Sequence, residues 1–347
     1  MESVPALEDL GWDAGWEAAF AEYRALGLEP GRVAVQHRGA YDVWLADGEA
    51  RARLPGRARR DAREADLPVV GDWVAVERAT EPPLVGAVLP RRTRISRRVS
   101  PDPTADTGRE QVVAANVDVV FCAFAVVDPL VPRLLERYLT LAWASGARPV
   151  VLLTKADLED DPRSSAHEIA AVGSDVPVHL VSTRSGLGLD EVRAYLAPGV
   201  TGALIGPSGV GKSSLVNALV GDELLATGET RKDGAGRHTT TRRELVLLPG
   251  GGLIVDNPGM REVHLWLADE GLREVFADVT ELVAQCRFRD CRHEREPGCA
   301  VQEALASGAL EPERWASYRE LERELADLEE RLARRERLRA RSRRRRR

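Results

Sequence analysis

The feature that most constrains this chain is a glycine-rich run in its second half, Gly206-Pro207-Ser208-Gly209-Val210-Gly211-Lys212-Ser213. It has the pattern G-x-x-x-x-G-K-S, in which backbone N–H groups surround the phosphates of a bound nucleotide. The apolar stretch Val200–Ile205 precedes the run, and the amphipathic stretch Ser214–Val220 follows it. This context is typical of a buried strand, a loop and a helix whose N-terminus faces an anion. The sequence therefore predicts a nucleotide-phosphate site rather than a glycine-rich turn without a ligand.

A second motif, Thr154-Lys155-Ala156-Asp157, lies about fifty residues upstream of the loop. The apolar runs Val117–Val127 and Pro149–Leu153 precede it and read as buried parallel strands, so the motif lies at the carboxyl end of a strand, where α/β sheets bind ligands. The Asp157 carboxylate can accept two hydrogen bonds from guanine, whereas adenine lacks that pair of donors. We expect the stem of Lys155 to pack along the base, and Ser182 and Thr183 to contact the base carbonyl.

Lysine usage supports both motifs. The chain has 49 Lys and Arg residues, but only Lys155, Lys212 and Lys232 are lysines. A lysine ammonium is a compact point charge and a guanidinium is a planar fork, so the two are not interchangeable at a tight phosphate site. Chance placement accounts for Lys232 but poorly for the other two. We expect Lys212 to reach the β- and γ-phosphate oxygens as a catalytic group, and Ser213 to bind Mg²⁺, with Ser214 beside it.

The third motif, Asp256-Asn257-Pro258-Gly259, lies downstream of the phosphate loop. We expect Asp256 to hold Mg²⁺ through water and the Gly259 N–H to sense the γ-phosphate. In ordinary GTPases the phosphate loop comes first and the guanine motif follows. Here the guanine motif comes first, and this order predicts a circularly permuted GTPase domain of the α/β class.

A run of three threonines, Thr239, Thr240 and Thr241, lies between the phosphate loop and Asp256. One of them should bind Mg²⁺ only when GTP is present, and we favour Thr240. Met260 stands where many GTPases carry a glutamine that orients water, so the protein alone should hydrolyse GTP slowly. His238 is the nearest replacement for that glutamine, although a solvated loop histidine remains an equal alternative.

Three of the four cysteines lie close together with one histidine, in the order Cys286-x4-Cys291-x-His293-x5-Cys299. Three thiolates and one imidazole make a closed tetrahedral Zn²⁺ set, so we expect one structural zinc ion per chain. Disulfides are disfavoured because the N-terminus has no signal peptide and an intracellular chain is kept reduced. Cys122 lies alone in an apolar run and reads as core.

The N-terminal third predicts a helix followed by a small barrel. Residues 11–27 have helical spacing of Trp16, Phe20, Tyr23 and Leu26. Residues 31–99 contain five short strand patterns separated by glycine-bearing turns, which suits an OB-fold. Its many arginines favour contact with RNA, although solvated arginines are expected in so Arg-rich a chain. Polar, Pro-rich residues 100–112 read as a linker.

The C-terminal region combines an apolar stripe with a basic tail. The stripe, spaced by three and four residues along one helix, consists of Trp315, Tyr318, Leu321, Leu325, Leu328 and Leu332. Residues 331–347 hold eleven Arg and one Glu, a net charge of +10, so the rest of the chain carries −16 of the total −6. A polyanionic partner and a disordered solubilising tail explain this run equally well. No apolar run is long enough to cross a membrane.

Together these patterns predict a multidomain α/β chain. The expected parts are an N-terminal helical extension (1–30), an OB-fold barrel that binds RNA (31–99), a linker (100–112), a circularly permuted GTPase domain (113–270), a helical zinc-binding domain (271–330) and an Arg-rich tail (331–347).

The serial order of these parts resembles the family of ribosome-small-subunit-dependent GTPases. The matching pieces, which run from about residue 30 to 320, are Ala115-Asn116-Val117-Asp118, Thr154–Asp157, Gly206–Ser214, residues 236–241, residues 256–262 and the four zinc-ligand candidates. The resemblance implies a cytoplasmic, monomeric factor without a membrane partner. It would bind GTP, GDP and the small ribosomal subunit with its rRNA, hydrolyse GTP on the subunit late in maturation, and then leave. Thr154 in place of Asn, and Asn257, are departures from the family pattern.

Two other functions remain open from the sequence. One is an RNA-binding protein that uses GTP as a structural or regulatory ligand with little turnover. The other is an ATP-dependent enzyme with an unrelated base site. Turnover stimulated by small ribosomal subunits would exclude the first, and nucleotide competition would exclude the second.

Overall fold

The structure is a computed structural model that describes residues 5–37, 39–56, 64–99, 109–128, 132–172, 176–207, 209–221, 243–256, 269–288, 290–323 and 325–326. The chain divides into two compact units. The first is built from Met1–Val99, Arg109–Leu130 and Ser145–Leu265; the second is built from Ser100–Gly108, Val131–Ala144 and Trp266–Arg347. In the described part of the chain, no helix has the length and apolar character needed to span a membrane.

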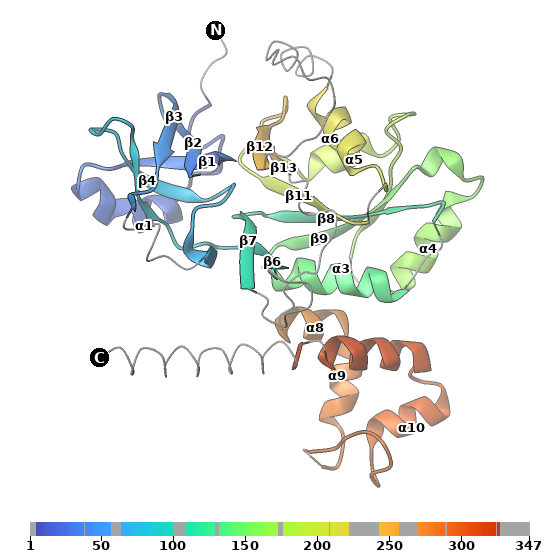
Figure 1. Ribbon diagram of the computed structural model, residues 1–347. Coiled ribbons are helices and arrows are strands. Elements are labelled where there is room, and N and C mark those ends of the chain that lie inside the picture. The colour runs from blue at the N-terminus through green and yellow to red at the C-terminus, as the bar shows by residue number, and fades with distance from the viewer. Residues whose placement is uncertain are drawn as a thin grey trace, which may run out of the picture. The chain divides into compact units, whose positions relative to one another are not determined.

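The first unit begins with a closed barrel of five strands, as the sequence predicts (Figure 1). Its strands are β1 (Glu29–Gln36), β2 (Ala40–Leu45), β3 (Gly48–Arg53), β4 (Trp73–Glu77) and β5 (Leu84–Val88). They pair in the order β1-β2-β3-β5-β4, and β4 pairs back onto β1, so the barrel closes. Alternate side chains such as Val33, Val43, Val74 and Val85 fill the interior, because successive residues of a strand point to opposite faces.

Helix α1 (Ala14–Ala25) precedes the barrel and begins at Asp13, whose carboxylate accepts a hydrogen bond from the Trp16 backbone N–H. Trp16 and Phe20 are buried one turn apart, as their spacing predicts. Leu26 is 74% exposed, in contrast to the apolar face expected from the sequence. The helix ends at residue 25, so Leu26 no longer lies on its buried stripe.

The other part of the first unit is a mainly parallel sheet. Five strands run parallel in the order β10-β9-β8-β11-β13, and β12 is antiparallel to β13. Their bounds are β8 (Val119–Ala125), β9 (Arg148–Thr154), β10 (Val178–Leu180), β11 (Thr201–Ile205), β12 (Arg243–Leu247) and β13 (Leu253–Asp256). Every residue of β8 is buried, which is the pattern of a strand covered on both faces. Cys122 in β8 is a core residue, as the sequence indicates.

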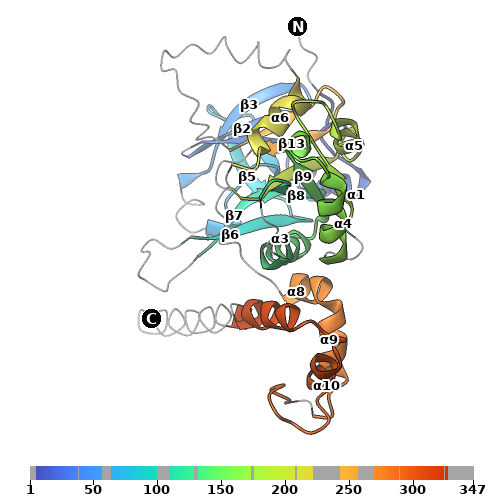
Figure 2. The ribbon, with the colours of Figure 1, turned by 90° about the vertical axis from the view of Figure 1, so that its right-hand side faces the viewer.

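Short helices accompany this sheet. They are η2 (Ala156–Leu158), α4 (Pro162–Val172), α5 (Leu189–Ala194) and α6 (Lys212–Val220). A further short helix, η1 (Glu64–Asp66), lies between β3 and β4 in the barrel part of the chain. Leu189 and Val192 of α5, and Leu215 and Leu219 of α6, join the apolar core of the sheet. The buried face of α6 therefore fixes the helix that follows the phosphate loop. Figure 2 shows α6 beside β13.

The barrel and the parallel sheet share one continuous sheet. Barrel strand β1 pairs with β12, with Val35 opposite Glu244 and Gln36 opposite Arg243. A separate hairpin joins β6 (Arg94–Val99) to β7 (Arg109–Ala115). Strand β7 therefore begins inside the range 100–112 that the composition indicates as a linker.

The second unit is helical. Its elements are α3 (Pro132–Ala144), α8 (Asp269–Val275), α9 (Ala277–Ala284), α10 (Ala300–Ser307) and a helix over residues 312–323. Helix α3 packs closely on α8, where a Cβ on Gly271 would lie 2.1 Å from the Thr140 carbonyl oxygen. Buried Glu136 of α3 pairs with Arg314 at 2.8 Å and accepts a hydrogen bond from Ser317. Thus α3 groups with the C-terminal helices, although its sequence lies within the range predicted for the GTPase domain.

Candidate functional site

The predicted nucleotide motifs meet at one edge of the parallel sheet. The guanine motif follows β9, the phosphate loop follows β11, and Asp256 is the last residue of β13. Because these strands are parallel, their carboxyl ends share that edge, and β8 alone separates β9 from β11. The chain leaves β8 toward β9 and β10, then crosses back to β11 on the other side. A reversal of this kind forms the crevice in which open α/β sheets bind ligands.

The phosphate loop requires glycine at its entry and at its exit. Gly206 has φ +146°, and a Cβ there would lie 2.2 Å from the Ala123 carbonyl oxygen of β8. Gly211 has φ +101° and directly precedes α6. The Lys212 ammonium donates hydrogen bonds to the carbonyl oxygens of Gly206 and Pro207, both at 2.6 Å. The Lys212 ammonium is therefore held by the backbone of the phosphate loop.

The residues predicted to read the base lie together. Ser182, which is buried, donates a hydrogen bond through its hydroxyl to Oδ1 of Asp157 at 2.5 Å. Asp157 and Thr183 are exposed, and Lys155 is half-buried. Lys155 has φ +59°, a left-handed conformation that residues other than glycine rarely adopt and that clusters at functional sites. The structure thus brings the candidate carboxylate and the serine loop into direct contact.

Thr154 has a role that the sequence analysis missed. Its buried hydroxyl donates to the Val210 carbonyl oxygen of the phosphate loop at 2.5 Å, and the Phe124 carbonyl oxygen of β8 lies at 3.1 Å. The side chain therefore ties the base motif to the phosphate loop. A hydroxyl has one proton, whereas an asparagine amide has two, so Thr154 can satisfy one of these carbonyls at a time. The unusual residue at this position was the only signal in the sequence.

Several predicted site residues lie outside the described residues. These are Ser208, His238, Thr239, Thr240, Thr241, Asn257, Pro258, Gly259 and Met260. The Arg-rich tail over residues 331–347 also lies outside them. Asp256 is described through its backbone, at the end of β13. Ser213 and Ser214 are exposed in the first turn of α6.

Several arginines of the barrel region, whose number favoured an RNA-binding surface, form ion pairs within the protein. Arg91 donates to Asp72 at 2.8 Å, and the Asp72 side chain is fully buried. Arg51 donates to Asp42 at 2.7 Å. Arg92 forms an ion pair with Asp13 and lies 4.2 Å from the centre of the Trp16 ring. These arginines stabilise the barrel and its helix.

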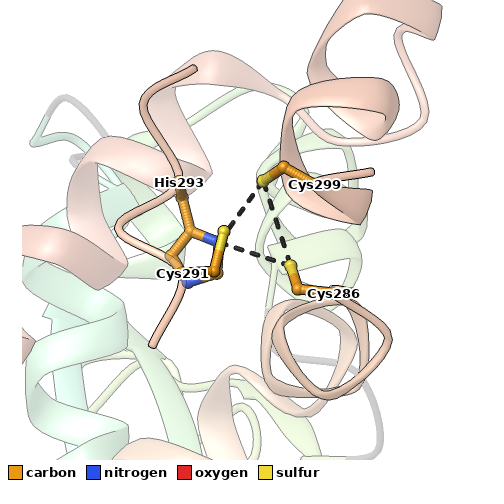
Figure 3. A group of neighbouring side chains, drawn as sticks. All are labelled: Cys286, Cys291, His293 and Cys299. Atoms are coloured by element: carbon orange, nitrogen blue, oxygen red, sulfur yellow. Dashed lines mark hydrogen bonds between the residues drawn. The ribbon is translucent and has the colours of Figure 1, made fainter. Parts of the chain in front are cut away.

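The four predicted metal ligands form one cluster in the second unit (Figure 3). The candidate ligand atoms of Cys286, Cys291, His293 and Cys299 all lie within 4.8 Å of one another. The Sγ atoms of Cys286 and Cys299 are 3.9 Å apart, and each lies 3.5 Å from Nδ1 of His293. A tetrahedral zinc ion with Zn–S of ~2.3 Å and Zn–N of ~2.05 Å requires spacings of about 3.8 and 3.6 Å. The spacings among Cys286, His293 and Cys299 therefore suit a zinc ion, and Cys291 offers a fourth ligand atom within 4.8 Å of the other three.

The loop that carries these ligands is held by its own polar groups. The Glu296 carboxylate accepts hydrogen bonds from three backbone N–H groups, which lower its pKa to about 2; they belong to Arg292, Glu294 and Arg295. The Gln302 side chain donates to the carbonyl oxygen of His293 at 2.6 Å. Cys299 directly precedes α10, at the N-cap position, and makes no side-chain cap hydrogen bond. The ligand positions therefore depend on local structure as well as on a metal.

His293 has the conformation and environment of a metal ligand. Its φ is +60°, a left-handed conformation, and its ring faces the sulfur atoms (Figure 3). Its ring contacts Trp315 edge to face, with ring centres 5.4 Å apart. Burial lowers the pKa of His293, which favours the neutral imidazole that a metal requires.

Comparisons with known proteins agree with this architecture. A family model described as "RsgA GTPase" matches residues 88–266. A "Small ribosomal subunit biogenesis GTPase RsgA" of Opitutus terrae is 45% identical, over 92% of this chain and 90% of its own. A protein of the same name from Streptomyces coelicolor is 46% identical, over 92% and 86% of the two chains.

Two solved structures are also similar. The crystal structure of YjeQ from Thermotoga maritima matches with a TM-score of 0.61 and 26% identity, over 86% of this chain and 99% of its own. YloQ, described as a circularly permuted GTPase, matches with a TM-score of 0.59 and 26% identity, over 86% and 96% of the two chains. The permuted order read from the motifs and the expected family are thereby confirmed: this chain belongs to the RsgA GTPase family.

Proposed function

We propose that this chain is a GTPase that acts late in the maturation of the small ribosomal subunit, in the cytoplasm and as a monomer. It binds the subunit and its rRNA, hydrolyses GTP there and then leaves. The observation that carries this proposal is the convergence of the phosphate loop and the base motif at one sheet edge, in a chain of the RsgA family. Its curated relatives are named for small-subunit biogenesis.

The phosphates would be held by residues 206–214. The backbone N–H groups of the loop and the N-terminus of α6 face the anion, and Lys212 exchanges its two carbonyl partners for the β- and γ-phosphate oxygens. Gly206 and Gly211 would let the backbone approach the phosphates, because they adopt conformations in which a side chain would be strained. This exchange neutralises charge that develops on the phosphates during hydrolysis.

The base would be read by the loop after β9 and the loop after β10. The Asp157 carboxylate accepts from guanine, while the hydrogen bond from Ser182 fixes its orientation. Lys155 covers the base with its stem, and Thr183 contacts the base carbonyl. Ala156 and Thr154 complete the loop; the Ala156 N–H donates to the Val181 carbonyl oxygen at 3.2 Å. Specificity follows because an adenine would leave the carboxylate without donors.

Magnesium would supply charge neutralisation at the phosphates. The exposed Ser213 hydroxyl at the start of α6 suits this role, together with Thr240 and, through water, Asp256. The Gly259 N–H would instead donate to the γ-phosphate. We also propose one structural Zn²⁺ per chain, held by the cluster of Cys286, Cys291, His293 and Cys299. All four ligands come from the protein, so this ion has no open position for chemistry.

GTP hydrolysis measured with and without purified small ribosomal subunits tests the proposed function. We expect slow turnover alone, a marked stimulation by subunits, and competition by GDP but not by ATP. Lys212→Ala is the matched control, because it removes the phosphate-binding ammonium. If subunits bind the protein but leave its turnover unchanged, the chain uses GTP as a structural or regulatory ligand and the proposal is wrong.

His238 is proposed as the group that orients the attacking water, because Met260 cannot do so. His238→Ala should keep GTP and subunit binding but lose about 10²-fold of the stimulated turnover. Single-turnover hydrolysis on the subunit measures this loss. Stimulated turnover within a few-fold of the unaltered protein would show that another group orients the water.

A further inference from the structure

The second unit contains a cavity of about 680 Å³ beside the metal cluster. It lies between the ligand loop and the helix over residues 312–323. The side chains that define its chemistry are Arg292 and His293 from the loop, and Trp315, Arg319 and Arg323 from the helix. Its volume lies within the range of roughly 300–1,000 Å³ that is usual for ligand pockets.

One wall of the cavity is an aromatic platform that the metal cluster supports. The Trp315 ring stacks on Tyr318, with ring centres 5.6 Å apart and planes 18° apart. The His293 and Trp315 rings pack edge to face, with ring centres 5.4 Å apart, and the Arg319 guanidinium lies over the Trp315 ring, 5.6 Å from its centre. Because His293 belongs to the metal cluster, a bound zinc ion would fix the imidazole and, through it, the indole.

The charged side chains that line the cavity differ in whether they form ion pairs. Arg319 donates to Glu322 at 2.8 Å, and Glu320, which also lines the cavity, pairs with Arg133 at 2.8 Å. Arg292 and Arg323 are exposed, and neither has an ion pair with any residue that the structure describes. The remaining lining charge is Glu294, which is also exposed. Two guanidinium groups are therefore available to an anion at this cavity.

An indole platform flanked by guanidinium groups suits one nucleotide of a single strand. The base stacks on the aromatic ring, and the phosphates on either side pair with the arginines. A duplex offers its phosphates but keeps its bases stacked inside the helix, so it cannot use the platform. We propose that this cavity holds an unpaired nucleotide of RNA. The proposal deepens the proposed function, since it identifies the type of rRNA segment that the C-terminal unit recognises.

Binding of a labelled single-stranded oligoribonucleotide to the full-length, zinc-loaded protein tests the cavity directly. Trp315→Leu should weaken single-strand binding by roughly 5- to 150-fold, and should leave binding of a hairpin duplex unchanged. Trp315→Tyr, which keeps an aromatic face, should restore most of the affinity. Zinc content and GTP affinity measured on the same preparations check that the unit remains folded.

Arg323→Ala gives an independent test at an exposed position that forms no ion pair with any described residue. Loss of one phosphate contact should lower the slope of log K against log salt concentration by about 0.7 for a single strand. The matched control is Arg295→Ala, which changes an exposed arginine of the ligand loop that does not line the cavity. It should leave both the slope and the affinity unchanged.

Two results would overturn the proposal. One is single-strand binding by Trp315→Leu and Arg323→Ala that equals that of the unaltered protein at full zinc occupancy. The other is loss of binding to intact subunits without loss of binding to protein-free RNA, because the cavity would then take a protein segment. GTP hydrolysis by the unaltered protein with and without subunits does not depend on either result, so failure here is distinct from failure of the proposed function.

Discussion

Replacement of Arg32 by methionine should lower the free energy of unfolding of the first unit far more than the same replacement of an exposed arginine. Arg32 lies on β1 and is only 2% exposed. Its guanidinium donates to the Leu10 carbonyl oxygen, to the Asn116 carbonyl oxygen at 3.1 Å and to the Thr201 hydroxyl at 2.8 Å. It thereby joins the N-terminal segment, the barrel and the first residue of β11, the strand that leads to the phosphate loop.

The expected cost follows from these contacts. Arg32→Met leaves two buried carbonyl groups and one hydroxyl without their charged donor, and each such loss costs roughly 1–3 kcal/mol. Part of this loss is offset, because the buried Nε of Arg32 has no hydrogen-bond partner and the methionine stem fills similar space. We expect a net loss of roughly 3–5 kcal/mol, a large share of the roughly 5–15 kcal/mol that stabilises a typical domain.

Chemical denaturation followed by tryptophan fluorescence would measure this loss, because Trp73 lies 5.3 Å from the Arg32 guanidinium. Arg92→Met is the matched control: it makes the same substitution beside Trp16, but Arg92 is 47% exposed and pairs with half-exposed Asp13. The control should cost at most about 1 kcal/mol. If the two variants lose unfolding free energies that differ by less than about 1 kcal/mol, burial does not account for the cost of Arg32→Met.

The cost of Arg32→Met should also depend on pH. Burial raises the pKa of Asp118 above its ordinary value of 3.8, while the Thr201 N–H and the charge of Arg32 oppose that rise. Removal of Arg32 therefore raises the folded-state pKa of Asp118 further. A carboxyl group with a raised folded pKa destabilises the fold above that pKa, and this penalty disappears as the pH falls through it. The difference in the free energy of unfolding between the variant and the unaltered protein should thus become smaller from pH 7 toward pH 4.

Three further outcomes are expected. Gly206→Ala should abolish GTP binding in a titration, because its Cβ would lie 2.2 Å from the Ala123 carbonyl oxygen. Gly209→Ala should weaken GTP binding less, because its Cβ meets no atom within 4 Å and only its φ of +83° opposes a side chain. Asp157→Asn should relax the preference for GTP and favour xanthine nucleotides, and unchanged selectivity among GTP, ATP and XTP would show that Asp157 does not read the base. Cys291→Ser should lower the zinc content measured by atomic absorption, from about one ion per chain, while GTP affinity persists; full zinc occupancy in this variant would contradict the four-ligand site.

Features that depend on a short stretch of chain could be predicted from the sequence. The phosphate loop needs glycines and one lysine at fixed spacing, so its pattern and its position after the base motif revealed the permuted order. The zinc-type cluster was recognisable because its four ligands lie within residues 286–299. The five barrel strands followed from alternation and turn residues. The roles of individual nucleotide-site residues remain predictions.

The pairing of segments that are distant in sequence became apparent only in the folded chain. No periodicity indicates that β1 pairs with β12, because strand pairing depends on which edges meet and not on local composition. Arg32 could not be distinguished from the other arginines of the chain until its guanidinium was seen to be buried. Helix α3 likewise joins the C-terminal helices through Glu136 and Arg314, residues far apart in sequence. Burial and long-range pairing are properties of the folded chain, so a sequence read locally does not contain them.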